Sequence, residues 1–395
     1  MAGFKIREQM NGIQEAPGKV WFWDLQDAVI DADRCIQCGT CVAVCPSDSI
    51  GIGAGDLPVL AKMCTGCSLC WDFCPRGGLR HEATWKLVGG DGGDGGGLEA
   101  VTERWTARAL PGVAGAQDGG VVSALLIALL EAGDLDGVLL ARESATEPWK
   151  GEAFLACTPA EVVECAGSFY NQTMALGHLD LKGHDLGPNP RIAVVGTPCE
   201  VEGITALQSR PWFWGSARVD AVVLTIALLC TKSFNYEKLM VGEIQRERGI
   251  PLERVGRVDV IRGKMIVQDR QGATLLEEPI RDFHGAALKG CDECADFLGS
   301  AADLSVGSVG SPDGWSSVLV RSGAGAAALA AAAGRLELRE LERPVALEKL
   351  EALDKRTAFA NLPRPFDPEA PLFIDYAEHL DAYAGTDRAP AVADR

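Results

Sequence analysis

Two matched cysteine runs constrain the fold of this 395-residue chain more than any other feature. Both runs have the spacing C-x2-C-x2-C-x3-C and end directly before a proline. The eight residues are Cys35, Cys38, Cys41 and Cys45 in the first run and Cys64, Cys67, Cys70 and Cys74 in the second. A loop this short presents three sulfurs from one side, so a fourth sulfur has to come from elsewhere in the fold.

This spacing is the ligand pattern of a ferredoxin that carries two four-iron clusters. The last cysteine of each run in such proteins binds the other run's cluster, because a cubane takes one thiolate on each of its four irons. We therefore expect two crossed ligand sets. These are Cys35, Cys38, Cys41 and Cys74 for one cluster, and Cys64, Cys67, Cys70 and Cys45 for the other.

Two other interpretations of the runs are less suitable. A disulfide framework needs an oxidising compartment, and no feature of the chain indicates secretion. Zinc sites usually combine CxxC pairs or mix cysteine with histidine, whereas this region holds only His81, after both runs. About residues 31–86 are also similar to bacterial-type dicluster ferredoxins.

The charge and hydropathy of the chain exclude several classes of partner. The formal net charge is −18, which argues against a nucleic-acid footprint and against an anionic membrane surface. The N-terminal segment lacks the apolar region of a signal peptide. The longest apolar runs are about half of the roughly twenty residues that a membrane span needs. We therefore expect a cytoplasmic protein with no membrane span, in a reducing compartment that keeps thiols free for iron.

Chain length and composition divide the sequence into segments. A chain this long predicts two or three domains. The glycine-rich stretch at residues 89–97 has the composition of a flexible linker. It is a poor phosphate-binding loop, because no strand precedes it and no Lys-Ser/Thr pair follows it. Residues 20–23 and 28–30 are predicted to form the first strand of the ferredoxin domain.

Beyond the linker the hydrophobic pattern predicts an α/β domain. Helices are expected at residues 119–132, 160–165 and 322–334. Strands are expected at residues 137–141, 191–196 and 219–229, with a hairpin formed by residues 257–261 and 264–267. The strand at residues 191–196 has the continuous apolar character of a central parallel strand. Residues 359–395 are expected to be irregular.

Four of the remaining cysteines form a second candidate constellation. Cys199 and Cys230 follow the strands predicted at 191–196 and 219–229, and Cys291 and Cys294 form a CxxC pair. The carboxyl ends of parallel strands open onto one sheet edge, where ligands usually bind. Spacing alone leaves a third iron–sulfur site, a zinc site and a redox dithiol open. Cys157 and Cys165 are interpreted as inert thiols, since free cysteine is commonly buried.

Six ordered motifs make residues 100–335 similar to the coenzyme F420 hydrogenase/dehydrogenase beta-subunit family. They are Gln117-Asp-Gly-Gly-Val-Val-Ser-Ala-Leu125, Ala166-Gly-Ser-Phe-Tyr170, Gly196-Thr-Pro-Cys-Glu200, Asp259-Val-Ile-Arg-Gly-Lys264, Gly290-Cys-Asp-Glu-Cys-Ala-Asp-Phe297, and Ala302–Gly310 with Gly314-Trp315. The fusion resembles F420H2-oxidising subunits that have the same ferredoxin front end. The resulting α+β fold comprises an extension (1–30), a two-cluster ferredoxin domain (31–86), a linker (87–99), a larger α/β FAD-binding domain (100–345) and a tail (346–395).

The resemblance implies an FAD and a third four-iron cluster in the larger domain, with Cys199, Cys230, Cys291 and Cys294 as its ligands. The flavin contacts that it implies are Gln117, Asp118, Gly119, Gly120, Gly167, Ser168, Tyr170, Arg262 and Lys264. A Gly-Gly pair that opens a helix suits a pyrophosphate, and a cation suits phosphate or a reduced flavin ring. The alternatives from the residues alone are ordinary turns for the glycines and a solvated hairpin for Arg262 and Lys264.

The resemblance further implies an F420-dependent oxidoreductase. It would oxidise or reduce the deazaflavin coenzyme F420 at FAD and exchange electrons with a protein partner through three clusters. We name no catalytic side chain, and we interpret His178 and His284 as ordinary histidines. Phe169 stands where many relatives have a basic residue, so a different substrate stays open. The alternatives are a ferredoxin-dependent reductase of another organic substrate and a non-catalytic electron-wiring subunit.

Overall fold

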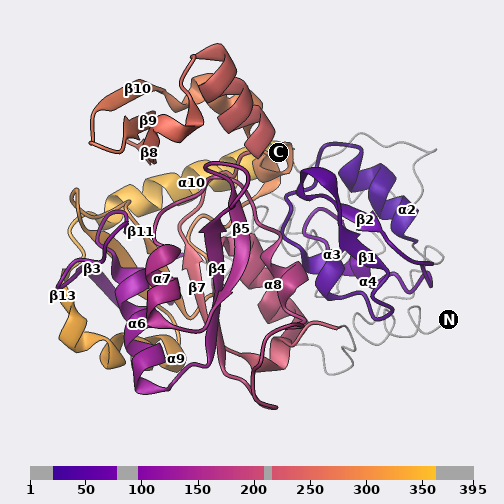
Figure 1. Ribbon diagram of the computed structural model, residues 1–395, viewed down its shortest axis with the longest axis horizontal. Coiled ribbons are helices and arrows are strands. Elements are labelled where there is room, and N and C mark those ends of the chain that lie inside the picture. Colours follow the sequence, from indigo (N-terminus) through magenta and orange to yellow (C-terminus); the bar gives the residue numbers. More distant parts are fainter. Residues whose placement is uncertain (1–20, 78–96, 209–215, 362–395) are drawn as a thin grey trace.

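The computed structural model describes residues 21–77, 97–208 and 216–361, and its centre is an eight-stranded mixed sheet (Figure 1). The strand order is β13 (Leu336–Glu340), β3 (Glu103–Ala109), β12 (Ser316–Val320), β11 (Leu304–Gly307), β7 (Val222–Leu228), β6 (Ile192–Gly196), β4 (Gly137–Glu143) and β5 (Gly151–Ala156). The four strands β11, β7, β6 and β4 are parallel. The strands that flank them pair antiparallel.

Helices cover both faces of this sheet. On one face lie α6 (Val121–Ala132), α7 (Pro159–Glu164) and α9 (Gly323–Ala331), and on the other lies α8 (Pro198–Gln208). Side chains along β4 alternate between the two cores: Val138 and Leu140 join the α6 side, and Leu139 joins the α8 side. This alternation is the two-residue period of a strand that is buried on both faces.

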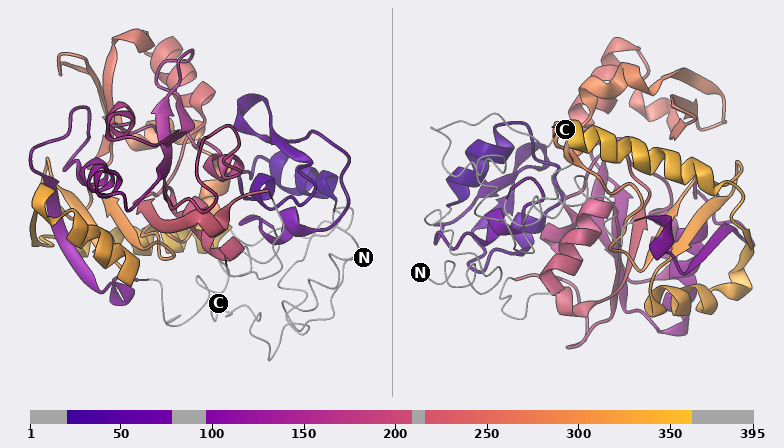
Figure 2. Two further views of the ribbon diagram at one scale, coloured as in Figure 1. Left: turned by 60° about the horizontal axis from the view of Figure 1, so that its bottom comes forward. Right: turned by 180° about the vertical axis from the view of Figure 1, so that it is seen from behind.

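A second, smaller lobe stands apart from the main sheet in Figures 1 and 2. It holds a three-stranded antiparallel sheet in the order β10 (Thr274–Pro279), β9 (Lys264–Asp269) and β8 (Val255–Ile261). The π-helix η6 (Glu237–Glu247) packs on it through a core that includes Leu239, Ile244 and Val258. The long helix α10 (Pro344–Asn361) crosses the molecule between this lobe and the main sheet (Figure 1).

The ferredoxin domain packs directly onto the larger domain. Its elements are α2 (Phe22–Leu25), η1 (Gln26–Ile30), α3 (Thr40–Ala43), β1 (Ile50–Ile52), η2 (Ala54–Asp56), β2 (Pro58–Leu60) and α4 (Leu69–Asp72), with β1 and β2 antiparallel. Its buried side chains, such as Val44 and Trp71, belong to the same hydrophobic cluster as Leu176 and Ile204 of the larger domain. The two domains therefore share one core.

The remaining short helices join these elements. They are η3 (Leu98–Ala100), η4 (Ala175–His178), η5 (Val219–Ala221), η7 (Leu252–Arg254), η8 (Ile280–Ala286), η9 (Lys289–Glu293) and η10 (Ala333–Arg335). Two of them position the site. η4 packs against α3 of the ferredoxin domain, and η9 carries the CxxC pair at the domain interface. In the described part of the chain, no helix combines the length and apolar content needed to cross a membrane.

The expected helices and strands of the larger domain are confirmed, including the parallel pairing of β6 with β7 and the β8–β9 hairpin. The first strand expected in the ferredoxin domain is wrong: residues 22–30 form α2 and η1. The buried residues there are Phe22, Leu25, Ala28 and Val29, and the steps of three and four residues from Phe22 to Leu25 and from Leu25 to Ala28 and Val29 are a helical period. The aromatic residues 21–23 suggested a strand, but the positions of the buried side chains follow the period of a helix.

One proposed domain boundary differs from the structure, and another lies outside the described residues. Helix α10 crosses the boundary placed between residues 345 and 346, and Leu347 and Ala358 are buried, so this part of the tail belongs to the larger domain. The glycine-rich stretch at residues 89–97 lies, except for Gly97, outside the described residues. The same holds for residues 1–20 and 362–395.

Docking of the two domains depends on a glycine at the start of the CxxC segment. A Cβ atom on Gly290 would stand 2.1 Å from the carbonyl oxygen of Arg34 in the ferredoxin domain and 2.8 Å from Ile36. Both contacts are far below van der Waals distance, and a backbone carbonyl has little freedom to move. We therefore infer that this position needs glycine for close approach of the two backbones.

We predict that Gly290→Ala loosens the domain interface. Overpacking of a close contact typically costs about 1–3 kcal/mol, so the midpoint of thermal unfolding should fall. Limited proteolysis should release the ferredoxin segment faster. Gly285→Ala is the matched control, because nothing lies within 4 Å of the added Cβ there. An unchanged Gly290→Ala protein in both assays would contradict the close-approach argument.

Candidate functional site

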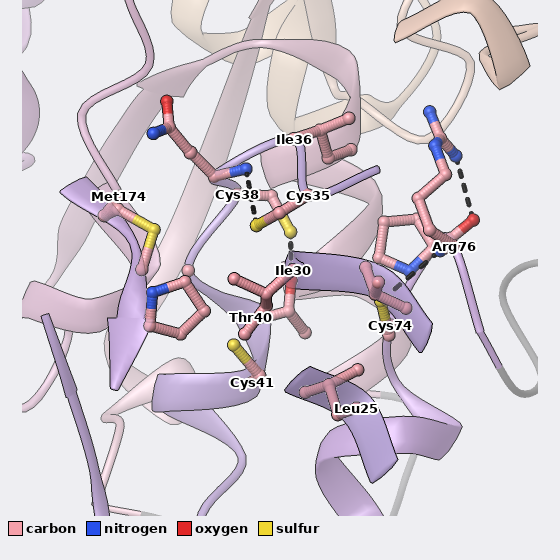
Figure 3. Close-up of a pocket in the computed structure, with 15 residues that line it drawn as sticks. Leu25, Ile30, Cys35, Ile36, Cys38, Thr40, Cys41, Cys74, Arg76 and Met174 are labelled. Carbon is pink, nitrogen blue, oxygen red and sulfur yellow. Dashed lines mark hydrogen bonds between the residues drawn. The ribbon is translucent and has the colours of Figure 1, made fainter. Parts of the chain in front are cut away.

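A pocket in the ferredoxin domain is lined by four cysteines from both runs, Cys35, Cys38, Cys41 and Cys74. Figure 3 shows their sulfurs turned toward a common space. These are three residues of the first run and the last residue of the second, as the crossed ligand set requires. Backbone N–H groups already point at two of the sulfurs: Gln37 donates to Cys35 Sγ over 3.4 Å and Arg76 donates to Cys74 Sγ over 3.4 Å.

The four remaining ferredoxin cysteines form a second group, made of Cys45, Cys64, Cys67 and Cys70. Burial raises the pKa of Cys70 well above its usual value, and the neighbouring thiolates of Cys67, Cys64 and Cys45 raise it further. The backbone N–H of Ser49 donates to Cys45 Sγ over 3.3 Å, and that of Gly66 donates to Cys64 Sγ over 3.4 Å. Buried thiolates this close repel one another unless a cation lies among them.

A third group lies at the carboxyl edge of the parallel strands. Cys199 begins α8 just after β6, Cys230 follows β7, and Cys291 and Cys294 lie in and directly after η9. Burial raises the pKa of Cys230, and the thiolates of Cys291 and Cys294 raise it further. Burial likewise raises the pKa of Cys294 to about 11. Two neighbouring parallel strands and η9 thus bring together cysteines from three separate segments.

A buried amide joins this third group to the segment that carries Tyr170. The Gln172 amide nitrogen donates to Ser233 Oγ over 3.0 Å, to Thr197 Oγ1 over 3.1 Å and to Cys199 Sγ over 3.7 Å. Ser233 Oγ in turn lies 3.9 Å from Cys230 Sγ. Sequence reasoning did not single out Gln172, because its partners are distant in the chain.

The three cysteine groups lie next to one another in a fixed order. After burial, the largest influence that raises the pKa of Cys199 is the thiolate of Cys38, across the domain interface. Cys70 of the second group likewise raises the pKa of Cys41 in the first group, although burial and the other thiolates contribute more. The order is therefore third group, first group, second group.

Among the described residues, no three or more His, Cys, Asp or Glu side chains lie close enough together to hold one metal ion. A cubane takes one thiolate on each of four irons, so its ligands surround a cluster instead of meeting at a point. The backbone donors to sulfur are also of the kind that tunes such clusters.

Arginines of the ferredoxin domain reach the third group across the interface. Arg34 makes a two-pronged ion pair with Glu293, between the two cysteines of the CxxC, over 2.7 and 2.5 Å. Arg76 is fully buried and donates to the carbonyl of Gly290 over 2.6 Å. Burial alone would lower the pKa of Arg76, but Cys294 and Glu293 outweigh it and raise the pKa. The partners lie more than two hundred residues apart, so no sequence pattern pointed to them.

The residues expected to contact a flavin gather at β8 and the start of α6. The Gln117 amide donates to the carbonyl of Val258 over 3.0 Å, and the Tyr170 hydroxyl accepts from the N–H of Val260 over 2.9 Å. Asp118 lies nearby, and burial, followed by the charge of Asp259, raises its pKa to about 6. Gly167 is exposed and Ser168 half-buried in the loop just before Tyr170. The smaller lobe therefore docks, through β8, onto the segments that carry Gln117 and Tyr170.

The two glycines of this loop have structural reasons to be glycine. A Cβ on Gly119 would stand 2.4 Å from the carbonyl oxygen of Ala107 in β3. Gly120 has a φ of 64° and no side chain caps the helix that starts after it, α6. Both glycines are therefore explained by the backbone turn that they form, without a ligand. The N-cap residue of α6, being a glycine, offers no side-chain partner to the first N–H groups of the helix.

Arg262 and Lys264 have the contacts of a solvated hairpin. Arg262 is 73 % exposed and pairs with Asp313 over 3.0 Å, and Lys264 pairs with Glu277 over 2.6 Å at an exposed position. Either side chain has to exchange its carboxylate partner before it can contact a phosphate. Phe169 packs near Trp149 with ring centroids 6.1 Å apart.

Comparison with known families accounts for most of the chain. Residues 104–180 and 189–344 match the N-terminal and C-terminal parts of the coenzyme F420 hydrogenase/dehydrogenase beta subunit, and residues 28–80 match a 4Fe-4S dicluster domain. The chain is 33 % identical, over 67 % of its length and 93 % of the relative's, to the coenzyme F420 hydrogenase subunit beta of Methanothermobacter thermautotrophicus. The chain belongs to this beta-subunit family.

Two further relatives extend the comparison. The coenzyme F420-dependent sulfite reductase of Methanocaldococcus jannaschii is 29 % identical over 84 % of the chain, which spans only 50 % of that relative. A chain of the F420-reducing NiFe hydrogenase complex from Methanosarcina barkeri has a TM-score of 0.59 and 28 % identity, covering 66 % of this chain and 90 % of that one. Members of this oxidoreductase family thus share the larger domain, and the dicluster match adds iron–sulfur binding.

Paired cysteine variants will test the crossed ligand sets. Cys41→Ser with Cys74→Ser removes two sulfurs from one group, so we expect the loss of one cluster, about four irons per chain. Cys41→Ser with Cys45→Ser removes one sulfur from each group, so two clusters should be damaged. Iron analysis and EPR after anaerobic purification distinguish the outcomes. The reverse result, with two clusters lost in the first pair, would show that each run binds its own cluster.

Proposed function

We propose that this protein is an F420-dependent iron–sulfur flavoprotein that exchanges electrons between coenzyme F420 and a protein partner. Hydride would pass between F420 and FAD, and single electrons would pass by way of three four-iron clusters. The observation that carries the proposal is the continuous row of three cysteine groups in a chain of this family. The row begins in the larger domain and ends in the ferredoxin domain.

The order of the groups suggests which end of the row faces the flavin and which end faces the protein partner. The group of Cys199, Cys230, Cys291 and Cys294 lies on the domain that has the family match, and the Gln172 network links it to the segment that carries Tyr170. The group of Cys45, Cys64, Cys67 and Cys70 lies at the other end of the row. We therefore assign the first of these groups to the flavin side and the last to the partner side, with physiological transfer in either direction.

The uncapped start of α6 supports an FAD site in the larger domain. This helix starts at Gly120 without a side-chain cap, and uncapped N–H groups favour a pyrophosphate. Gln117, Asp118, Gly119, Gly120, Gly167, Ser168 and Tyr170 would position the cofactor, with Arg262 and Lys264 as movable cations. When bound, FAD supplies the exchange between two-electron and one-electron chemistry. The protein's part is binding, orientation and electrostatics.

A ferredoxin-dependent reductase of another substrate is the second candidate function. One observation favours it: the uncharged ring of Phe169 packs beside Trp149, where the family resemblance leads us to expect a basic residue. The similar coenzyme F420-dependent sulfite reductase acts, by its name, with F420, so it supports the first candidate. Under the second candidate the same row would carry electrons inward, from the ferredoxin domain to the larger domain. A non-catalytic electron-wiring subunit is the outcome if the chain binds no flavin.

We predict that the anaerobically purified protein contains about twelve irons and one FAD per chain. Reduced F420 should bleach the flavin absorption and then give rise to the EPR signals of reduced clusters. About eight irons would remove the third cluster. Flavin that stays oxidised with F420H2 but is reduced by reduced ferredoxin would favour the second candidate function, and absence of flavin would favour the wiring subunit.

A further inference from the structure

Arg76 is the largest side chain among the fully buried ones in the described part of the chain. It directly follows Pro75 and the cluster residue Cys74. Its Nε donates to the carbonyl of Gly290 over 2.6 Å, and its Nη1 donates to the carbonyl of Pro75 over 2.8 Å. Figure 3 shows Arg76 beside the pocket of the first cysteine group. A guanidinium of the ferredoxin domain is thus anchored to the CxxC segment of the larger domain.

Cysteines of two groups surround this guanidinium. Cys294, Cys291 and Cys199 of the third group all act on Arg76 electrostatically, and Arg76 in turn acts on Cys35 of the first group. Arg76 therefore lies at the junction of the two groups. The order of the row makes this junction the step at which an electron crosses from one domain to the other.

Glu293 contacts both arginines at the junction. It lies 4.0 Å from Nε of Arg76 and accepts two hydrogen bonds from the Arg34 guanidinium. A thiolate-bound cluster is anionic and gains a further negative charge on reduction, so a buried guanidinium beside it interacts more favourably with the reduced state.

We propose that Arg76 is a positioning residue that raises the reduction potentials of the two clusters on either side of the domain interface. This inference rests on the proposed function, because it assumes a cluster in the third group as well as in the first. A fixed positive charge favours the reduced state of each neighbouring cluster, and net charge and hydrogen bonds are known determinants of cluster potential. Because Arg76 acts on both clusters, it shifts the two potentials in the same direction, toward easier reduction on both sides of the interface.

The central test compares variants of opposite sign by EPR-monitored redox titration of the full-length, cluster-loaded protein. Arg76→Met keeps the apolar stem and removes the charge, so the reduction equilibrium constants of both junction clusters should fall about tenfold or more, which is about 59 mV for a one-electron couple. Glu293→Gln keeps the shape and removes the opposing charge, so both potentials should rise. Arg76→Lys should restore most of the loss.

Lys150→Gln is the matched control for looser docking. Lys150 makes an ion pair with Asp56 of the ferredoxin domain over 3.3 Å, at the same domain interface but outside the three cysteine groups. Its loss weakens docking without removing charge from the junction, so the cluster potentials should stay unchanged. The outer cluster of Cys45, Cys64, Cys67 and Cys70 should also shift less than the junction clusters in every variant.

Unchanged potentials in Arg76→Met at full iron content would overturn the proposal, as would equal shifts in the Lys150→Gln control. If the Arg76→Met protein does not assemble its clusters, Glu293→Gln decides the test. A rise in both junction potentials in that variant supports the proposal, and no rise overturns it. Failure of the proposed function is recognised separately. It appears in the wild-type protein as about eight irons or as a lack of response to F420, whereas the titrations use a chemical reductant.

Discussion

The structure depends on the close docking of the ferredoxin domain onto the CxxC segment of the larger domain. The two domains share a hydrophobic cluster, and the interface brings the Arg34–Glu293 ion pair, the Arg76 contact with Gly290 and a close backbone approach at Gly290 into one place. Without this docking, the third cysteine group would not lie next to the first.

The larger domain supplies the other half of the arrangement through its parallel strands. β6 and β7 end at the same sheet edge, which brings Cys199 and Cys230 together. η9 then adds Cys291 and Cys294 from a third segment, and the ferredoxin domain covers this edge. The parallel strands and η9 thus hold four cysteines at one edge of the sheet, beside the two cysteine groups of the dicluster domain. The smaller lobe docks through β8 onto the segments that carry Gln117 and Tyr170.

Much of the larger domain was predictable because its elements have strong local signals. The helix at α6 and the strands β4, β6 and β7 are long apolar runs with clear ends, and their positions are confirmed. The first segment of the ferredoxin domain was not, because its aromatic residues suit a strand while its buried positions follow a helical period. Helix α10 was also missed at the proposed start of the tail. Its buried side chains are packed by elements distant in the chain, and a local pattern does not contain that information.

The sequence by itself determined which cysteines act together within each short run, because three ligands of a cubane come from one loop and spacing is a local property. It also determined the family, through motifs that lie in a fixed order. Only the tertiary structure decided how the three groups are ordered, that Cys38 comes close enough to Cys199 to raise its pKa, and that Arg76 and Glu293 occupy the junction between the two groups. These are contacts between residues far apart in the chain, and they arise from how two domains bury a common surface.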